Sequence, residues 1–404
     1  MRDIDLFQLA LGLVPPWMVA DANFDAEEKR LDIEIDFKTG GRFACPECGK
    51  ADCPVHDTVK KTWRHLNFFQ HQAFLHARVA RIECPDHGVR LVTVPWARPG
   101  SGFTLLFEAF VMTLVKAMPV AAAARLVGEH DTRLWRVIQH YVEDAVARMD
   151  LADLRRVAID ETSATRGEKY ISLFVDIDAR KVVYVTEGKD ADTVARFADH
   201  VDDHNSDASR IKQVCVDMSA AYIRGVTDNL TEAEITFDKF HAVKLVNDAV
   251  DEVRRIESRL RPELKHSRFL WLKNESRLSV AQSATLDALI RMHLKTARAY
   301  RLRLAFQEIY NAPSHEWGEL ILDRWYSWAI RSRLEPIKKA ARTIMRYRDG
   351  ILRWFDTKIA NGLIEAINSL VQAAKAKARG YRSLRNLIAI TYLIAGKIDL
   401  KLAT

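Results

Sequence analysis

Two aspartates and one glutamate occupy positions where side chains can do chemistry. "RVAID" (156–160) ends on Asp160, and "IKQVCVDM" (211–218) nearly ends on Asp217; both read as strands. Side chains just beyond strand ends are anchored by a rigid sheet, so functional groups collect there. If the first and fourth strands are neighbours, the two carboxylates lie side by side and repel unless a cation bridges them. Mg²⁺ suits that position because it binds a few carboxylates and keeps several waters.

Glu365 is the third acid and comes from a predicted helix far along the chain. Helical spacing gives this helix a polar stripe of Asn361, Glu365, Asn368 and Gln372. It also gives an apolar stripe that should pack, made of Leu363, Ile367, Leu370, Val371 and Ala374. Glu365 is therefore expected at the edge of the buried face, leaning toward the sheet.

Five cations follow Glu365 within residues 361–386, and no further acid appears before Asp399. They are Lys375, Lys377, Arg379, Arg382 and Arg385. A solvated helix usually mixes charges of both signs, because opposite charges at i,i+4 support each other. The run is therefore expected to follow a phosphate backbone, and the alternative is a helix that is simply solvated.

Each acid also has a structural interpretation. An aspartate at a strand end commonly forms a turn or caps a helix. Asp176 and Asp178 compete with Asp160, but they flank a predicted hairpin turn where aspartate is favoured for structural reasons. Glu161 would point to the opposite face of a continuing strand. His241, in "FDKFHAVK", is expected near the acids in a supporting role, and its alternative is a packing role at a helix start.

Four of the five cysteines lie within forty residues, which indicates metal binding. Cys45 and Cys48 form a CxxC pair typical of tetrahedral zinc sites. Two candidates complete the site: Cys84 with His87, or Cys53 with His56, each with the same spacing. A zinc ion here would be structural, holding together a domain with a small core. Cys215 sits in a buried-looking strand and is read as a core residue.

The composition indicates a protein with several globular domains and a polyanionic partner. The chain has 404 residues, 48% of them hydrophobic and 28% charged, and a net charge of +7. These values are typical of a globular chain and exclude a disordered one. No apolar run is long enough to span a membrane, and the first residues lack the features of a signal peptide. A cytosolic location with reduced cysteines is expected.

Periodicity divides the chain into five segments. Short strands and turns fill 30–98, followed by a helical stretch that breaks at Pro119 and around 128–131, the outline of a helix-turn-helix. Strands at 156–160, 170–178 and 181–188 precede alternating helices and strands, which predict a mixed sheet covered by helices. Residues 241–350 read as helix throughout. The expected domains are 1–98, 99–152, 153–240, 241–350 and 351–404.

Several long stretches resemble the DDE transposases of bacterial insertion sequences, specifically the IS-L-three family. They are "CPECG…HDTVKKTWRHLNF…RIECPDHG", "VPWARPGSGFTLLFEA", "VAIDETS", "VCVDMSAAY", "FDKFHAVK" and "NGLIEAINS…AKARGYRSLRN". They follow the family's order and cover nearly the whole chain.

The resemblance implies a multidomain α/β protein. A zinc-binding β domain and a helix-turn-helix would precede a ribonuclease-H-like domain interrupted by an all-helical insertion. It implies the triad Asp160, Asp217 and Glu365, holding two Mg²⁺ (or Mn²⁺) ions for DNA cleavage and strand transfer. Because family members carry a second CxxC at the later position, it favours Cys84 and His87 as the remaining zinc ligands. This chain departs from that pattern by having His87.

The resemblance also implies partners. They are the element's terminal inverted repeats and target DNA, with a homodimer or larger assembly on the ends, no membrane and no small-molecule substrate. The location would be cytoplasmic, at the nucleoid. Two rival functions stay open: a non-catalytic DNA-binding regulator derived from a transposase, and a metal-dependent nuclease without strand transfer.

The tryptophans of the helical region are expected mostly in the core, with one available to stack on DNA; they are Trp271, Trp317, Trp325, Trp328 and Trp354.

Overall fold

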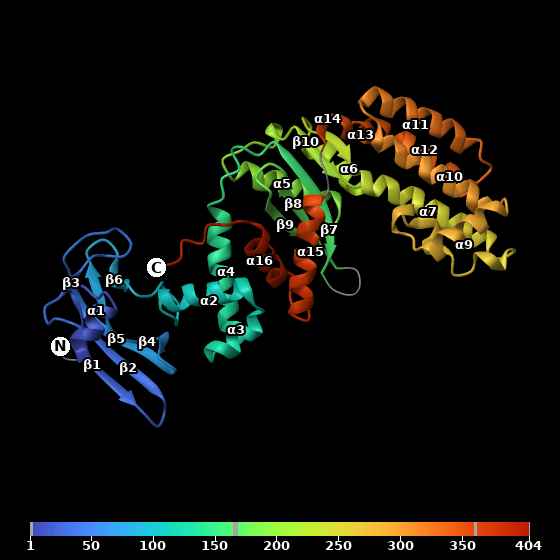
Figure 1. Ribbon diagram of the computed structural model, residues 1–404. Coiled ribbons are helices and arrows are strands. Elements are labelled where there is room, and N and C mark those ends of the chain that lie inside the picture. Colours follow the sequence, from blue (N-terminus) through green and yellow to red (C-terminus); the bar gives the residue numbers. More distant parts are fainter. Residues whose placement is uncertain (1–2, 165–168, 359–361, 404) are drawn as a thin grey trace. The chain divides into compact units, whose positions relative to one another are not determined.

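The computed structural model describes residues 3–164, 169–358 and 362–403 (Figure 1). The chain forms two compact units. One contains the residues up to Tyr141 together with those from Asp399 onward, and the other runs from Val142 to Ile398. Among the described residues, no helix has the length and apolar character that a membrane crossing needs.

The first unit begins with a twisted sheet whose strands run in the order β1-β2-β5-β4-β3, with β6 paired to β5. Its elements are α1 (Asp3–Ala10), β1 (Trp17–Asp25), β2 (Arg30–Phe37), β3 (Arg42–Phe43), β4 (Cys53–Phe68), β5 (His71–Cys84) and β6 (Gly88–Leu91). The predicted period-two pattern is confirmed in β2, where Leu31, Ile33 and Ile35 are buried and the residues between them are not. Trp17, Trp63 and Trp96 meet edge to face in the core.

Three helices follow and give the predicted helix-turn-helix outline. They are α2 (Leu105–Ala117), α3 (Val120–Val127) and α4 (Asp131–Ala147). Thr104 caps α2 by accepting a hydrogen bond from the backbone N–H of Phe107. Pro119 separates the first two helices, and Gly128 ends α3 in the left-handed conformation with φ 70°. Thr132, Arg136 and His140 are exposed on α4.

A buried arginine joins this helical segment to the sheet. The Arg64 side chain is 2% exposed and donates to the backbone oxygens of His65 and Ala73. Its guanidinium carbon lies 5.1 Å from the ring centre of Phe107 on α2, and its Nε lies 3.8 Å from a Glu129 carboxylate oxygen. These contacts of Arg64 therefore connect the sheet to α2 and to the turn after α3.

The second unit is built on a five-stranded sheet in the order β11-β10-β7-β8-β9. The strands are β7 (Arg156–Ser163), β8 (Tyr170–Asp176), β9 (Lys181–Glu187), β10 (Gln213–Val216) and β11 (Glu234–Phe237). β7, β8 and β9 form an antiparallel meander, and β10 lies parallel to β7 and to β11. This confirms the mixed sheet and places the first and fourth strands side by side. Cys215 is 1% exposed, as expected of a core residue.

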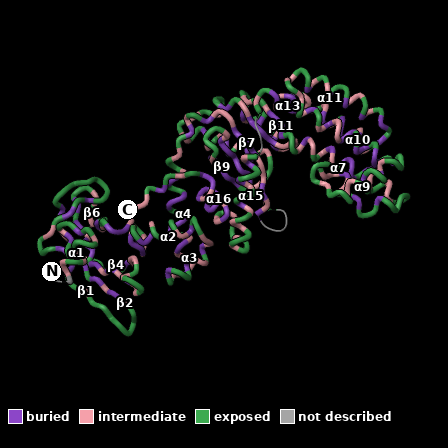
Figure 2. Tube along the Cα trace, viewed as in Figure 1, coloured by how far each residue is buried: buried purple, intermediate pink, exposed green. Residues whose placement is uncertain are grey.

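Helices cover both faces of this sheet. They are α5 (Ala191–Asp202), α6 (Ala220–Asn229), α15 (Gly362–Lys377) and α16 (Leu384–Ala395). Phe197 of α5 and Tyr222 of α6 share a core with Ile159 and Phe174, while the Tyr392 hydroxyl of α16 accepts a hydrogen bond from Val185 of β9 at 3.0 Å. The buried residues run through these layers in Figure 2.

The described residues 241–350 contain helices and turns but no strand, which confirms the helical insertion. The helices of this region and those just after it are α7 (Lys239–Glu257), α8 (Arg268–Leu272), α9 (Val280–Arg291), α10 (Lys295–Gln307), α11 (His315–Ile330), α12 (Glu335–Arg346), α13 (Arg348–Leu352) and α14 (Trp354–Thr357). Helix α7 packs against α10 and α12, and α11 packs against the same two helices, so the four form a closed bundle.

The prediction for the α15 stripe needs a correction. Ile364, Ile367 and Val371 are buried, whereas Leu370 is 52% exposed. The packed face is therefore rotated toward Ile364. Asn361, the first residue of the predicted polar stripe, lies outside the described residues.

Candidate active site and zinc cluster

Asp160 and Asp217 stand at the same level on neighbouring strands. The parallel register pairs Ala158 of β7 with Cys215 of β10. Each aspartate lies two residues beyond this pair, so both emerge where β10 ends, after Val216. Asp217 accepts a hydrogen bond from the Ser219 backbone N–H at 2.9 Å and thus also shapes the turn into α6. The predicted neighbouring of the two strands is confirmed, but Asp160 does not end its strand: β7 continues to Ser163, so Asp160 lies within it, whereas Asp217 follows the last residue of β10.

The environment of Asp160 favours its neutral form in the absence of a cation. Burial raises the pKa of its carboxyl group to about 6, and the nearby charges of Glu161 and Asp217 add to the shift. The Glu161 backbone N–H and the His241 side chain oppose it. A positive ion at this position would offset the repulsion among these acids.

Glu161 is the acid that the sequence interpretation set aside. The strand continues to Ser163, so alternation directs Glu161 to the face opposite Asp160. Burial raises the pKa of Glu161, and the Asp217 charge raises it further. Asp217 therefore acts on both acids from the strand end.

A buried Asp–His pair lies at the start of α7. Asp238 is 2% exposed and caps the helix by accepting from the backbone N–H groups of Phe240 and His241. Its carboxylate also lies 2.9 Å from His241 Nδ1. This hydrogen bond raises the pKa of His241, and the charges of Asp217 and Asp160 add to the effect. His241 therefore lies within the electrostatic field of the two predicted acids.

Helix α15 is attached to β7 by three polar side chains in successive turns. Asn368 Nδ2 donates to Asp160 Oδ2 at 2.6 Å, and Gln372 Nε2 donates to Thr162 Oγ1 at 2.6 Å. Lys375 Nζ donates to the Ser163 carbonyl oxygen at 2.6 Å. The helix that carries Glu365 is thus held in register with the strand that carries Asp160.

Glu365 itself is exposed, one helical turn before Asn368. Among the described residues, the metal-type group found with ligand atoms within 4.8 Å of one another consists of cysteines and a histidine, not these acids. The structure therefore places Asp160 and Asp217 at the same level on adjacent strands and Glu365 on the adjoining helix. It does not bring all three carboxylates to the spacing of ligands around one ion.

Asn368 has a feature that bears on metal binding. Its Oδ1 is buried and has no hydrogen-bond partner among the described residues, although its Nδ2 is bound to Asp160. A buried, unpaired oxygen on a side chain bound to a carboxylate is costly unless water or a cation completes its coordination. The donor set at this edge, all of it oxygen, fits Mg²⁺ or Mn²⁺.

The basic residues after Glu365 have different surroundings. Lys375 is bound to Ser163, and Arg385 pairs with Glu143 of α4. Lys377, Arg379 and Arg382 are exposed, as is Arg385. Because Arg385 is already paired with a carboxylate, Lys377, Arg379 and Arg382 are the ones best placed for an external polyanion.

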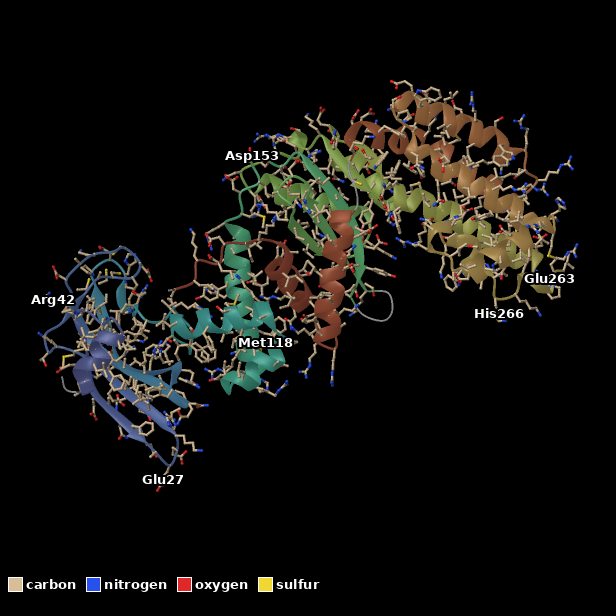
Figure 3. All side chains as sticks on the ribbon, viewed as in Figure 1. Glu27, Arg42, Met118, Asp153, Glu263 and His266 are labelled. Carbon is tan, nitrogen blue, oxygen red and sulfur yellow. The ribbon has the colours of Figure 1, made fainter. Side chains whose placement is uncertain are left out.

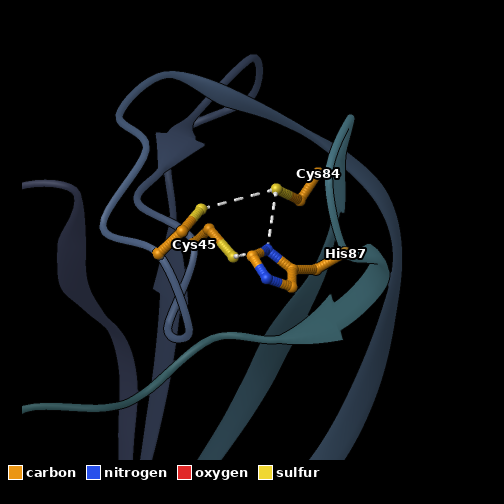
Figure 4. A group of neighbouring side chains, drawn as sticks. Cys45, Cys84 and His87 are labelled. Atoms are coloured by element: carbon orange, nitrogen blue, oxygen red, sulfur yellow. Dashed lines mark hydrogen bonds between the residues drawn. The ribbon is translucent and has the colours of Figure 1, made fainter.

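Cys45, Cys48, Cys84 and His87 form a compact cluster (Figure 4). The Cys48 and Cys84 sulfur atoms are 3.8 Å apart, and His87 Nδ1 lies 3.7 Å from Cys84 Sγ and 3.8 Å from Cys45 Sγ. Zn–S bonds of about 2.3 Å in a tetrahedron give ligand separations of roughly 3.8 Å. The four side chains therefore fit a zinc ion.

The chain around this cluster supports the same fit. Burial opposes ionisation of the Cys84 thiol, but backbone N–H groups of Asp86 and His87 and the His87 ring lower its pKa to about 6. The Glu47 carboxylate lies 3.7 Å from His87 Nε2, on the far side of the ring from the cluster. The alternative pair lies outside the four-residue group: Cys53 donates to the Lys50 carbonyl, and His56 lies beside Asp57.

Sequence reasoning missed the roles of Asn368, Gln372 and Asp238. The first two were recognised as members of a polar stripe, but nothing in the sequence paired them with residues 208 and 210 positions away. Asp238 precedes a helix, which is the usual position of a cap. Its hydrogen bond to the His241 ring could have been inferred from the i,i+3 spacing.

Comparisons with known proteins agree with this arrangement. A family model described as a transposase matches residues 157–391, a helix-turn-helix domain of transposase family ISL3 matches 92–142, and a zinc finger of transposases IS204, IS1001, IS1096 and IS1165 matches 41–87.

Two transposases match this chain along most of their own lengths. The transposase for insertion sequence element IS1557 of Mycobacterium tuberculosis is 29% identical over 97% of this chain and 96% of its own. The transposase for IS1001 of Bordetella parapertussis is 27% identical over 84% of this chain and 85% of its own. The resemblance seen in the sequence is confirmed: this chain belongs to the ISL3 family of DDE insertion-sequence transposases.

Proposed function

We propose that this protein binds the ends of an insertion sequence and catalyses metal-dependent phosphodiester cleavage and strand transfer. The observation that carries the proposal is that Asp160 and Asp217 stand at the same level on adjacent strands, with the helix bearing Glu365 fastened to Asp160 through Asn368. The three acids come from β7, the end of β10 and α15, and ligands commonly bind beyond strand ends in folds of this kind.

Asp160, Asp217 and Glu365 would hold two Mg²⁺ or Mn²⁺ ions. When bound, such a pair stabilises negative charge on the attacking and leaving oxygens of an in-line displacement. The fit rests on the raised pKa of Asp160, which a cation would lower, and on the unpaired Asn368 oxygen. Glu365 needs a side-chain rearrangement to join the other two acids.

The remaining side chains at the site orient these ligands. Asn368 Nδ2 donates to one Asp160 oxygen, Oδ2, and the Glu161 backbone N–H donates to the other, Oδ1, at 2.9 Å. Asp238 fixes the His241 ring through Nδ1, and the raised pKa of His241 favours the protonated ring, in which Nε2 also donates and can act toward a phosphate or a carboxylate. We assign His241 this supporting role.

The DNA contacts are proposed from exposure and charge. On α4, Thr132, Arg136 and His140 form an exposed row that could enter a major groove and contact base edges. Lys377, Arg379 and Arg382 would contact phosphates near the active site. The proposal also includes the division into five domains. It further includes a dimer or larger assembly on paired ends, and a zinc ion bound by Cys45, Cys48, Cys84 and His87.

The test uses a duplex carrying the element's own ends, Mg²⁺, and three proteins: wild type, Glu365→Gln and Glu252→Gln. Glu252 is an exposed helical glutamate on α7 and is the matched control. The proposal expects nicking and joining by wild type and by the control, and binding without either reaction by Glu365→Gln. Equal cleavage by all three proteins would refute the role of Glu365. Binding without cleavage by all three would favour the regulator, and cleavage without joining would favour the nuclease.

A further inference from the structure

The helical insertion carries more positive charge than the whole chain. Residues 241–350 contain 22 lysines and arginines against 13 aspartates and glutamates, whereas the complete chain has a net charge of only +7. The rest of the protein is therefore slightly acidic. A fold does not need this excess, because surface charges of mixed sign serve solubility equally well.

The excess is arranged in stripes on two helices of the bundle. On α10 the exposed residues Lys295, Arg298 and Arg301 follow one another at i, i+3 and i+6. On α12 Lys339, Arg342 and Arg346 occupy i, i+3 and i+7, opposite the buried Ile337, Ala341 and Ile344. Because the buried residues lie on the other side of α12, the charged stripe is the outward face of an amphipathic helix.

Helix α11 packs against both α10 and α12, and its outer side is also basic and aromatic. Arg324 and Arg331 are exposed there. Trp317 is 55% exposed and Trp328 is 42% exposed, although most tryptophans of this region were expected in the core. Trp271 and Trp325 fulfil that expectation at 0% and 2%. Nitrogen-tipped side chains project outward from these helices in Figure 3.

Carboxylates on these helices are already engaged elsewhere. Glu319 and Asp323 pair with Arg348, and Glu335 pairs with Lys338. The Glu316 carboxylate accepts from the Ser314 hydroxyl at 2.6 Å.

The exposed cations, in contrast, have no carboxylate within ion-pair distance among the residues that the structure describes. They are Lys295, Arg298, Arg301, Arg324, Arg331, Arg333, Lys339, Arg342 and Arg346. The fully buried Arg303 shows what a structural arginine looks like here: it donates to Asn247 Oδ1 at 2.7 Å and to the Leu272 carbonyl at 2.8 Å.

We propose that the outer surface of α10, α11 and α12 binds the phosphate backbone of duplex DNA without reading its sequence. Cations without a carboxylate partner, at helical spacing, complement a polyanion with one charge per about 1.7 Å of axis, and each phosphate contact releases counterions. Arg298 donates to the Ser332 carbonyl oxygen at 3.0 Å and Arg331 to the Ser327 carbonyl oxygen at 2.8 Å, which leaves the positive charge of both uncompensated. A carboxylate-bearing protein surface would fit less well, because it would need a matching row of acids at the same spacing. The inference rests on the proposed DNA partner and adds a contact region distinct from α4 and from the residues after Glu365.

The test measures binding of a scrambled duplex, without element ends, as a function of salt concentration. The variants are K295Q/R298Q/R301Q and K339Q/R342Q/R346Q in the full-length, zinc-loaded protein. The matched control is K29Q/K38Q/K60Q, which removes the same charge from exposed lysines of the N-terminal sheet region. Circular dichroism melting of each protein checks that the fold is retained.

For each bundle variant we expect the slope of log K against log salt to fall by about 2 to 3, since each lost phosphate contact removes roughly 0.9. The control should keep the wild-type slope. Equal slopes in all four proteins would overturn the assignment of this surface. An equal loss in the control would also overturn it, because the effect would then follow total charge. No binding of any duplex by wild type would instead refute the DNA partner itself.

Discussion

The zinc cluster and the acidic edge of the second sheet are both metal-type sites, but only the first is assembled in the folded chain. Cys45, Cys48, Cys84 and His87 lie with their ligand atoms within 4.8 Å of one another. Asp160 and Asp217 stand at the same level on adjacent strands, while Glu365 remains exposed on an adjoining helix. A structural site can close tightly because nothing has to enter it. A catalytic site must leave room for substrate, so its ligands can come together when metal and DNA bind.

The largest expected effect is on the stability of the first unit, and it should distinguish the zinc cluster from the acidic edge. Cys48→Ser removes one zinc ligand, and zinc binding in small domains is worth about 10 kcal/mol or more of apparent folding free energy. Hydrogen exchange should then show loss of protection over β4 and β5 while β7 and β8 stay protected. Cys53→Ser is the control, and it should retain zinc and protection. Loss of zinc in the Cys53 variant alone would show that the ligand set has been assigned wrongly.

A second change addresses the acidic edge. Asp217→Asn should reduce cleavage of end-bearing DNA at least about 100-fold, because metal-ion stabilisation of the transition state is worth several kcal/mol. Zinc content and hydrogen exchange in the first unit should stay the same. A variant that cleaves within a few-fold of wild type would contradict a role for Asp217 as ligand.

The third change is expected to increase stability, whereas Cys48→Ser is expected to lower it. Asp160→Asn should stabilise the metal-free second unit by about 2 kcal/mol at pH 8, because the folded state raises the pKa of this carboxyl from 3.8 to about 6. Folding then favours the protonated acid, so the wild type loses stability as the pH rises from 4 through 6. The gain should be small near pH 4, where the acid is protonated in the folded state and only about half ionised in the unfolded state. Denaturant unfolding at pH 4 and pH 8, without divalent metal, measures it, and a pH-independent difference would contradict the account.

The smallest expected effect concerns the hydrogen bond between α15 and β7. Asn368→Ala should lower kcat about 10-fold, as loss of a group that orients a metal ligand does, with little change in DNA affinity. Excess Mn²⁺, which binds such ligands more tightly than Mg²⁺, should restore part of the rate. Gln372→Ala, one turn further along, is the control because it contacts Thr162 and not an acid. Identical rates in both variants would reduce Asn368 to a packing role.

The sequence predicted the parts of the molecule that depend on local pattern. Period-two runs located β2 and part of β5, β-branched runs located β7, β8 and β9, Pro119 and Gly128 located the helix-turn-helix breaks, and the CxxC spacing located half of the zinc cluster. The alternation of helices and strands predicted that the strands of Asp160 and Asp217 are neighbours, although Asp160 was expected to end a strand that in fact continues to Ser163. These features need only the properties of short segments.

What could not be predicted depends on the contacts between distant segments. Leu370 was expected to pack, but the hydrogen bonds of Asn368 and Gln372 to β7 rotate the helix so that Ile364 is buried instead. Lys375 looked like a phosphate ligand until the structure showed it bound to the Ser163 carbonyl oxygen. Arg64 joins the sheet to the helix-turn-helix through Phe107 and Glu129, contacts with no sequence signature.

The most direct test of the central claim counts divalent ions on the assembled complex. Zinc-loaded wild type and Glu365→Gln, each bound to a duplex with an element end, are titrated with Mn²⁺ and followed by calorimetry and electron paramagnetic resonance. The account predicts two Mn²⁺ ions per protomer in wild type and weaker binding with a smaller count in the variant, with zinc unchanged in both. Identical Mn²⁺ binding by the two proteins would contradict the claim that Glu365 joins Asp160 and Asp217 around the catalytic ions.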